Sequence, residues 1–192
     1  MNYLYGWNPV AEFIVDEFAA VGGHIDGIVV DDSYFSGGLQ HIGHDVFPLG
    51  KIAFGPRDTV LNCLGYRNLV RRIEIGDYLN SAGVLRSFVS RDAKLYPGSR
   101  VELGAVLLGD VIVERNSVIG EHCLLWGGAR VCHDSRVGRG VFMASGSIVG
   151  GQCVIGDACT IGFNSSVKEK SRLRGGTRIG ANRFQVGNAD TW

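Results

Sequence analysis

The residue pair with the clearest chemical potential is His133 and Asp134, which stand next to each other in residues 131–138. A histidine side chain changes its charge near neutral pH and can take a proton from an amine or a hydroxyl group. A neighbouring carboxylate can orient the imidazole ring or support its positive charge. The pair could therefore act as a general base, although a surface histidine with no catalytic role is compatible with the same local sequence.

A second set of candidate residues follows the predicted β-strands in the first part of the chain. The set consists of Gly6, Asn8, Asp31, Asp32 and Gly65. In parallel sheets, ligands bind beyond the carboxyl ends of the strands, and the N–H groups at a helix N-terminus can hold a phosphate. An acid pair after a strand can bind ribose hydroxyls or the edge of a base. The alternative is that these residues bind no ligand. Gly6 and Asn8 would then only form a tight turn, and Asp31 and Asp32 would only cap a loop.

Residues 1–86 predict a small α/β domain with a Rossmann-like parallel sheet. Strands are expected at residues 2–5, 24–30, 45–48 and 59–64, and helices at residues 10–21 and 68–82. Asn8 suits the N-cap of the first helix, and Pro9 suits its first turn. An order of strand, helix, strand and then strand, helix is typical of a parallel sheet. Arg67, Arg71 and Arg72 around the start of the second helix could meet phosphates, or could simply be solvated.

Residues 87–192 predict an all-β domain built on a six-residue repeat. Every sixth residue from Val89 to Ile179 is aliphatic or Met, and the residue two positions before each of them is small. Residues two apart on an extended strand face the same side, so both positions should point inward. A repeat of this kind is typical of a β-helix. The pattern ends at Arg183 and Gln185, which occupy the next inward positions.

The repeat resembles that of the hexapeptide-repeat acyltransferases, and this resemblance implies a left-handed, three-sided prism with eighteen residues per coil. A small α/β domain followed directly by such a prism is similar to the bacterial sugar acetyltransferases of the sialic acid O-acetyltransferase and nucleotide-4-amino-sugar N-acetyltransferase type. The resemblance covers nearly the whole chain. It implies that residues 1–86 bind the nucleotide of a nucleotide-sugar acceptor. It also implies that residues 87–192 bind acetyl-CoA in a groove between neighbouring subunits of a homotrimer.

Residues 131–138 and 142–156 resemble the family's catalytic His segment and the Gly-ending stretch one coil later. The resemblance makes His133 the general base and Asp134 the acid beside it. Gly151 stands eighteen residues after His133, so it should stack on the same corner and offer its N–H to the acetyl oxygen. The freed nucleophile would attack the thioester directly, without an acyl-enzyme. The residues expected to contact CoA are Gly151, Gly162, Ser165 and Gly180.

The chain departs from the family pattern at three places. The first loop, residues 6–9, is not Gly-rich and has no His, and residues 179–186 do not continue the small-residue pattern. Trp126 and Phe142 occupy the positions of an Asn and a second His. We expect these aromatic residues to line an acyl or acceptor pocket that is more apolar than usual. Because they lie roughly half a turn from His133 on the perimeter, a neighbouring chain would have to bring them to it. Alternatively, they only fill the subunit interface.

Composition excludes several classes of function. The net charge is zero, which gives no indication of a nucleic-acid partner, and no apolar run of about 18 residues could span a membrane. The N-terminus carries no secretion signal, so a cytoplasmic location is expected. No Cys-x-x-Cys spacing suggests a metal site, and Cys123, Cys153 and Cys159 fall on inward small positions, as expected for core residues. His122 is expected at the surface. A metal site on such a prism would need three histidines, and residues 87–192 contain only His122 and His133.

The sequence therefore predicts an acetyl-CoA-dependent, trimeric, metal-free acetyltransferase. Its expected acceptor is the amine of a nucleotide-linked amino sugar in the synthesis of a surface polysaccharide or glycan. O-acetylation of a sugar of the sialic acid type is an alternative, and so is a β-helix that serves as a noncatalytic binding scaffold. The residues do not decide between N- and O-transfer, and they do not identify the sugar, the nucleotide or the acyl group.

Overall fold

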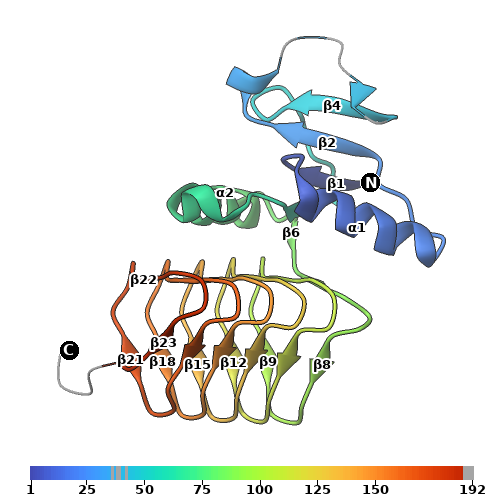
Figure 1. Cartoon of the computed structure of the whole chain (residues 1–192). Coiled ribbons are helices and arrows are strands. Elements are labelled where there is room, and N and C mark those ends of the chain that lie inside the picture. The colour runs from blue at the N-terminus through green and yellow to red at the C-terminus, as the bar shows by residue number, and fades with distance from the viewer. Residues whose placement is uncertain (36, 38–39, 42, 188–192) are drawn as a thin grey trace.

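The computed structural model shows a small α/β unit seated on one face of a long three-sided prism (Figure 1). It describes residues 1–35, 37, 40–41 and 43–187. Residues 188–192, the end of the predicted second domain, lie outside this range. The fold class predicted from the sequence is confirmed: a mainly parallel sheet precedes a left-handed parallel β-helix.

The α/β unit is built on a six-stranded sheet with the strand order β3-β4-β2-β1-β5-β6. The strands are β1 (Asn2–Tyr5), β2 (Gly27–Val30), β3 (Gln40–His41), β4 (His44–Pro48), β5 (Thr59–Asn62) and β6 (Leu85–Arg86). All neighbouring pairs are parallel except β3 and β4. Because β6 belongs to this sheet and the next strand belongs to the prism, the chain passes from one unit to the other at residue 87.

Two helices connect the strands. Helix α1 spans Pro9–Ala20, and the Asn8 side chain caps it by accepting a hydrogen bond of 2.8 Å from the Val10 N–H. Helix α2 spans Leu69–Ser81 and is capped in the same way by Asn68. Two short 3₁₀ turns, η1 (Asp32–Tyr34) and η2 (Tyr66–Asn68), precede a strand and a helix and were not predicted. No helix in the described residues is long and apolar enough to cross a membrane.

The prism consists of two-residue strands that return to the same face every eighteen residues, as the pairing of Val106 with Leu124 shows. The strands of the first face are β7 (Phe88–Val89), β10 (Val106–Leu107), β13 (Leu124–Leu125), β16 (Phe142–Met143), β19 (Thr160–Ile161) and β22 (Arg178–Ile179). The second face has β8 (Lys94–Leu95), β11 (Ile112–Val113), β14 (Arg130–Val131), β17 (Ile148–Val149), β20 (Ser166–Val167) and β23 (Phe184–Gln185). The third face has β9 (Arg100–Val101), β12 (Val118–Ile119), β15 (Arg136–Val137), β18 (Val154–Ile155) and β21 (Arg172–Leu173).

The inward aliphatic positions form the prism core as predicted. Each one from Leu107 to Ile179 is buried, and so are Cys123, Cys153 and Cys159. Val89 and Leu95 are more than one-third exposed, because the first coil has no preceding coil to cover it. At the other end, β23 adds one strand beyond the regular pattern.

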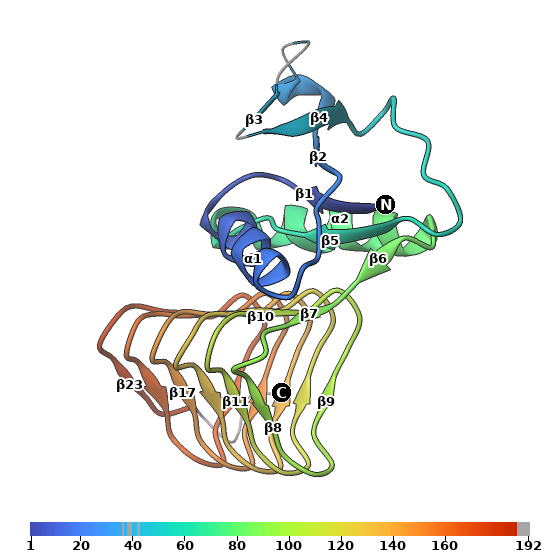
Figure 2. The same cartoon turned by 90° about the vertical axis from the view of Figure 1, so that its right-hand side faces the viewer.

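The first face, which we call the covered face, carries the α/β unit. Its outward residues Phe88, Val106, Leu124 and Phe142 are all buried. They pack with Val10, Ile14 and Leu69, which belong to α1 and α2, and both views place α1 directly over this face (Figure 2). Burying an apolar side chain of this size contributes about 1.5–3 kcal/mol. The third face carries Arg100, Arg136 and Arg172 at the matching outward positions, and all three are exposed.

Arg72 joins the two units from within. It is fully buried, whereas the sequence left it as a phosphate ligand or a solvated residue of α2, so that expectation was wrong. Its guanidinium donates to the carbonyl oxygens of Asn62 and Leu64 in the α/β unit and to those of His122 and Cys123 in the prism. Burial lowers the pKa of Arg72 to about 10, and the residue therefore remains charged at neutral pH.

His122 is likewise buried rather than exposed, because α2 covers it. Gly76 lies directly against the ring, where a Cβ would overlap it, and the His122 Nε2 atom lies 3.2 Å from the Asp77 carboxylate. Desolvation lowers the pKa of His122. Arg139 pairs with Asp77 at 2.6 Å and with Glu121 at 2.8 Å, so the guanidinium is the positive partner of these two carboxylates. The cluster holds α2 against the prism.

Candidate active site

His133 lies at the prism corner between the second and third faces, in the turn that follows β14. Its side chain is 54% exposed, and its Nδ1 atom lies 2.9 Å from the carboxylate of Asp134. The His133 backbone N–H donates to the carboxylate of Glu114. The corner presents the imidazole outward on a rigid support, because each strand of the prism is paired with the coils before and after it.

The Asp134 carboxylate determines which ring nitrogen of His133 carries the proton. The pKa of Asp134 lies below its ordinary value, first because His133 donates a hydrogen bond to it and second because Asn116 does. An ionised carboxylate can only accept hydrogen bonds, so the His133 Nδ1 atom carries the proton. In the neutral ring the outward Nε2 atom then has the lone pair, and it can take a proton from a substrate.

Asp134 adopts a left-handed backbone conformation, with φ of 57°. Asn116, Gln152 and Lys170 occupy the same corner in neighbouring coils with nearly the same φ. The Nδ2 atom of Asn116 donates to the Asp134 carboxylate at 3.0 Å, one coil away. Asn116 therefore helps to position the Asp134 carboxylate, which in turn orients the His133 ring.

Replacing Asn116 with glycine should raise the pKa of Asp134 towards its ordinary value, because the carboxylate loses a donor that favours its charged form. Glycine tolerates the left-handed φ, as Gly98 does at the same corner. We expect turnover to fall about 2- to 10-fold, the worth of one ordinary hydrogen bond. NMR titration of the Asp134 carboxyl carbon would measure the shift, and an unchanged titration would show that Asn116 has only a structural role.

Gly151 lies against the His133 ring on the next coil. A Cβ atom there would be 2.7 Å from the His133 Nε2 atom, so only glycine lets the imidazole lie this close to the backbone. The neighbouring Gln152 N–H donates to the His133 carbonyl at 2.9 Å. The Gly151 N–H has no acceptor within the described part of the chain. The corner thus places a proton acceptor next to a backbone donor.

The remaining residues expected to contact CoA lie at another corner. Gly162 and Gly180 stack on each other, one coil apart, where the covered face meets the second face. Ser165 is buried, and its hydroxyl donates to the Gly180 carbonyl inside the prism. The Ser165 side chain therefore does not reach the surface. CoA binding along the second face, between the two corners, stays a prediction.

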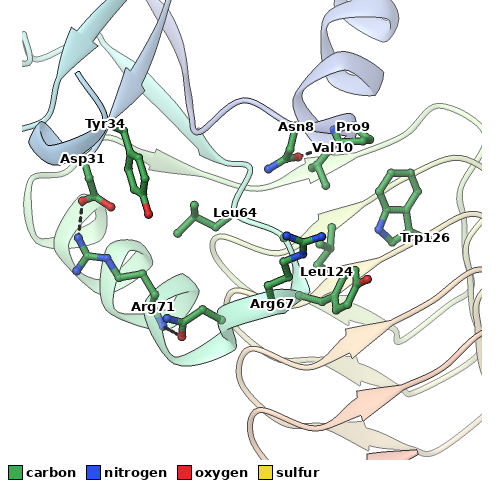
Figure 3. A pocket seen from close by; sticks show the side chains of 13 residues that line it. Asn8, Pro9, Val10, Asp31, Tyr34, Leu64, Arg67, Arg71, Leu124 and Trp126 are labelled. Atoms are coloured by element: carbon green, nitrogen blue, oxygen red, sulfur yellow. Dashed lines mark hydrogen bonds and ion pairs between the residues drawn. The ribbon is translucent and has the colours of Figure 1, made fainter. Parts of the chain in front are cut away.

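A cavity of about 540 Å³ lies between the α/β unit and the covered face (Figure 3). It is lined by Asn8, Pro9, Val10, Asp31, Tyr34, Leu64, Gly65, Tyr66, Arg67, Asn68, Arg71, Leu124 and Trp126. Its wall combines the carboxyl ends of β2 and β5, the first turn of α1 and the turn before α2. This is where ligands bind in a parallel sheet.

The cavity brings together some of the predicted acceptor residues and leaves others out. Asn8, Asp31, Gly65 and Trp126 line it. Gly6 does not, although its φ of 85° makes the turn that leads to Asn8. Asp32 accepts a hydrogen bond of 2.8 Å from the Gly50 N–H and so fixes a loop on the other side of β2. Phe142 is covered by Tyr66, with the ring centroids 4.6 Å apart.

The aromatic and apolar part of the cavity wall was not predicted from the sequence; it consists of Tyr34, Leu64, Tyr66 and Leu124. Tyr34 and Tyr66 belong to 3₁₀ turns that have no periodic pattern. Leu124 could have been recognised, because the first four outward positions on this face, Phe88, Val106, Leu124 and Phe142, are apolar, whereas the last two are Thr160 and Arg178. That pattern marks a prism face covered by another unit.

Within one chain, the cavity and His133 lie apart. The cavity borders the covered face and Trp126, whereas His133 lies at the corner opposite that face. Trp126 and His133 follow β13 and β14 and so lie at different corners of the prism, separated by one of its sides. The imidazole therefore does not line the cavity of its own chain.

Solved structures with the same two-part fold include several acetyltransferases. The acetyltransferase domain of PglB from Neisseria gonorrhoeae is 21% identical, with a TM-score of 0.84 over 97% of this chain and 91% of that chain. PerB from Caulobacter crescentus, solved in complex with CoA and GDP-perosamine, is 20% identical, with a TM-score of 0.81 over 97% of this chain and 89% of that chain. WeeI from Acinetobacter baumannii is 20% identical, with a TM-score of 0.72 over 98% and 97%.

No family model and no curated protein sequence matches the chain. The likeness is therefore carried by the repeat pattern and by the arrangement of the two units in space. In both respects, the chain resembles the hexapeptide-repeat sugar acetyltransferases.

Proposed function

We propose that the chain transfers an acetyl group from acetyl-CoA to the amine of a nucleotide-linked amino sugar. The observation that carries this proposal is the exposed His133–Asp134 pair beside Gly151, whose N–H has no acceptor within the described residues. The neighbours in structure support it, since PerB was solved with CoA and GDP-perosamine, and the PglB domain was solved with acetyl coenzyme A.

In the proposed reaction, the Nε2 atom of His133 takes a proton from the acceptor amine as its nitrogen attacks the thioester carbon. The C–N bond forms, and the carbonyl oxygen becomes an oxyanion that the Gly151 N–H stabilises. A contact of this type is worth about 2.7–4 kcal/mol. Collapse of the intermediate breaks the C–S bond, and the thiolate of CoA leaves and takes the proton back from the imidazolium. Asp134 keeps the ring oriented throughout.

The acceptor site and the base would come from two chains of a homotrimer. The distance between the cavity and His133 within one chain supports this arrangement. The site of each neighbouring pair would combine the cavity of one chain, including Trp126, with His133 of the other. Acetyl-CoA would then lie along the second face, between Gly151 and Gly162.

A thiol-release assay tests the proposed function directly. Purified protein is incubated with acetyl-CoA and with amino sugars linked to UDP, GDP, dTDP or CMP, and free CoA thiol is measured. We expect acceptor-dependent release with at least one of them, and mass spectrometry should place the acetyl group on nitrogen. Acetyl groups found only on a hydroxyl would favour the O-acetyltransferase alternative. Absence of release with every sugar would favour a noncatalytic scaffold.

Replacing Gly65 with tryptophan should block the acceptor cavity without distorting the fold, because a Cβ at Gly65 meets no atom within 4 Å. We expect the Gly65→Trp variant to bind acetyl-CoA normally and to lose at least about tenfold in acceptor affinity, since the indole would occupy space that the ligand needs.

The same variant tests the shared site. Alone, the Gly65→Trp and His133→Ala variants should both be strongly impaired at an acceptor concentration below the wild-type Kd. Coexpressed, they should form mixed oligomers in which the open cavity of one chain meets the intact His133 of another, so activity should return. If activity does not return although light scattering and mass spectrometry show mixed oligomers, the shared site is wrong.

A further inference from the structure

We infer that Arg67 is the residue that binds the phosphate groups of the acceptor, and that the neighbouring arginines do not. The inference rests on the proposed function, because it assigns a role within the same cavity. Three arginines lie close together where β5 leads into α2, and the structure gives each of them a different environment.

Arg72 is excluded by burial. Its guanidinium is enclosed between the two units and saturated by four backbone carbonyl groups. None of its donors faces the cavity, so its charge stabilises the junction and not a ligand.

Arg71 lines the cavity, but its charge is already balanced. It donates to the Asp31 carboxylate across the cavity wall (Figure 3). It also pairs with Glu74 at 3.3 Å on its own helix. The hydrogen bond to Asp31 is the main reason that the pKa of Arg71 is raised. A phosphate would have to compete with two carboxylates for this guanidinium.

Arg67 lines the cavity with no carboxylate to neutralise it in the described chain. Its guanidinium lies between Asn8 and Leu124, in the middle of the cavity wall (Figure 3). Among the lining residues, two arginines stand against one aspartate, so the cavity has a net charge of +1. A planar guanidinium with several donors suits the oxygen atoms of a diphosphate.

The rest of the cavity fits the other parts of such a ligand. The Tyr34, Tyr66 and Trp126 side chains contribute aromatic surface to the wall, on which a base or the apolar face of a sugar can lie. The volume of about 540 Å³ is in the range of cavities that hold small organic ligands. The Arg67 guanidinium is thus the unneutralised cation of a pocket that is otherwise mainly aromatic and apolar.

Calorimetric titration with UDP, GDP, dTDP and CMP tests this role. For the nucleotide that binds best, the Arg67→Gln variant should raise Kd about 10- to 100-fold, as expected for lost hydrogen bonds to a charged group. Its affinity should also depend less on salt concentration, because a charge–charge contact is gone. Binding of acetyl-CoA should be unchanged. The matched control is Arg57→Gln, which removes the same charge from the exposed surface outside the cavity and should leave Kd unchanged.

The outcomes separate the two proposals. If the Arg67→Gln variant binds nucleotides as tightly as the wild type, while the wild type releases thiol with a nucleotide sugar, the role of Arg67 is wrong and the function stands. If the Arg57→Gln variant weakens binding as much as the Arg67→Gln variant does, the effect is one of net charge and the role of Arg67 is again wrong. If the wild type binds no nucleotide and releases no thiol, both proposals are wrong.

Discussion

Replacing His133 with alanine is expected to lower turnover about 10²- to 10⁴-fold, the usual contribution of a general base. Without the imidazole, the corner loses the base that takes the proton from the acceptor as the C–N bond forms. Folding should be unaffected, because the side chain is 54% exposed and contacts mainly Asp134. The loss should appear in kcat of the thiol-release assay, while the affinities for acetyl-CoA and for the acceptor stay near the wild-type values.

The matched control for this experiment is Arg115→Ala. Arg115 is exposed and occupies the same corner position one coil earlier, eighteen residues before His133. Its removal changes the corner surface without removing the base, so we expect less than about a threefold change in rate, within the range of a lost surface contact. A His133→Ala variant that turns over as fast as the control would rule out His133 as the base.

Replacing Arg72 with leucine is expected to lower the free energy of unfolding by about 3–5 kcal/mol. The carbonyl oxygens of Asn62, Leu64, His122 and Cys123 would lose the guanidinium as a donor, and leucine offers them none. The Cys123 carbonyl would keep its hydrogen bond from the Val106 N–H. Because two of these carbonyls belong to each unit, the junction should weaken together with the fold. Urea unfolding monitored by circular dichroism would measure the change, and limited proteolysis would show whether residues near the junction become accessible.

The control is Arg71→Leu, one residue earlier on the same helix. Arg71 is 40% exposed and its ion pairs are partly solvated, so we expect a loss of no more than about 1 kcal/mol. An Arg72→Lys variant keeps the charge but has fewer donors and no planar fork, and it should recover only part of the stability. Equal unfolding midpoints for the Arg71→Leu and Arg72→Leu variants would contradict the proposed role of Arg72.

Local patterns in the sequence were sufficient for much of the architecture. The six-residue repeat predicted the prism because an inward position is a purely local requirement: a residue two positions from another on a strand must share its side. The Asn8 cap is local in the same way, because the N–H that donates to its side chain belongs to Val10, two residues away. The coil length and the catalytic assignment of His133 came from resemblance to a family, since the repeat period alone does not give the number of sides.

Contacts between distant residues could not be obtained in this way. Arg72 and His122 both looked like surface residues, because each belongs to a locally polar segment. Each is buried by residues about 50 positions away, and no periodicity records such a contact. The apolar outward residues from Phe88 to Phe142 do indicate the covered face. This pattern appears only when residues three repeats apart are compared.

The sequence by itself determined that residues 87–187 wind into a β-helix, because the six-residue period is a local property of the chain. The shared corner of His133 and Gly151 followed only once the family resemblance supplied a coil of eighteen residues. Tertiary structure alone decided where the α/β unit sits on that prism, which arginine it buries, which it pairs with Asp31 and which it leaves facing the cavity. Those outcomes depend on how the surfaces of the two units fit together. Each surface is made of residues that lie far apart in the sequence, so no local pattern predicts the fit.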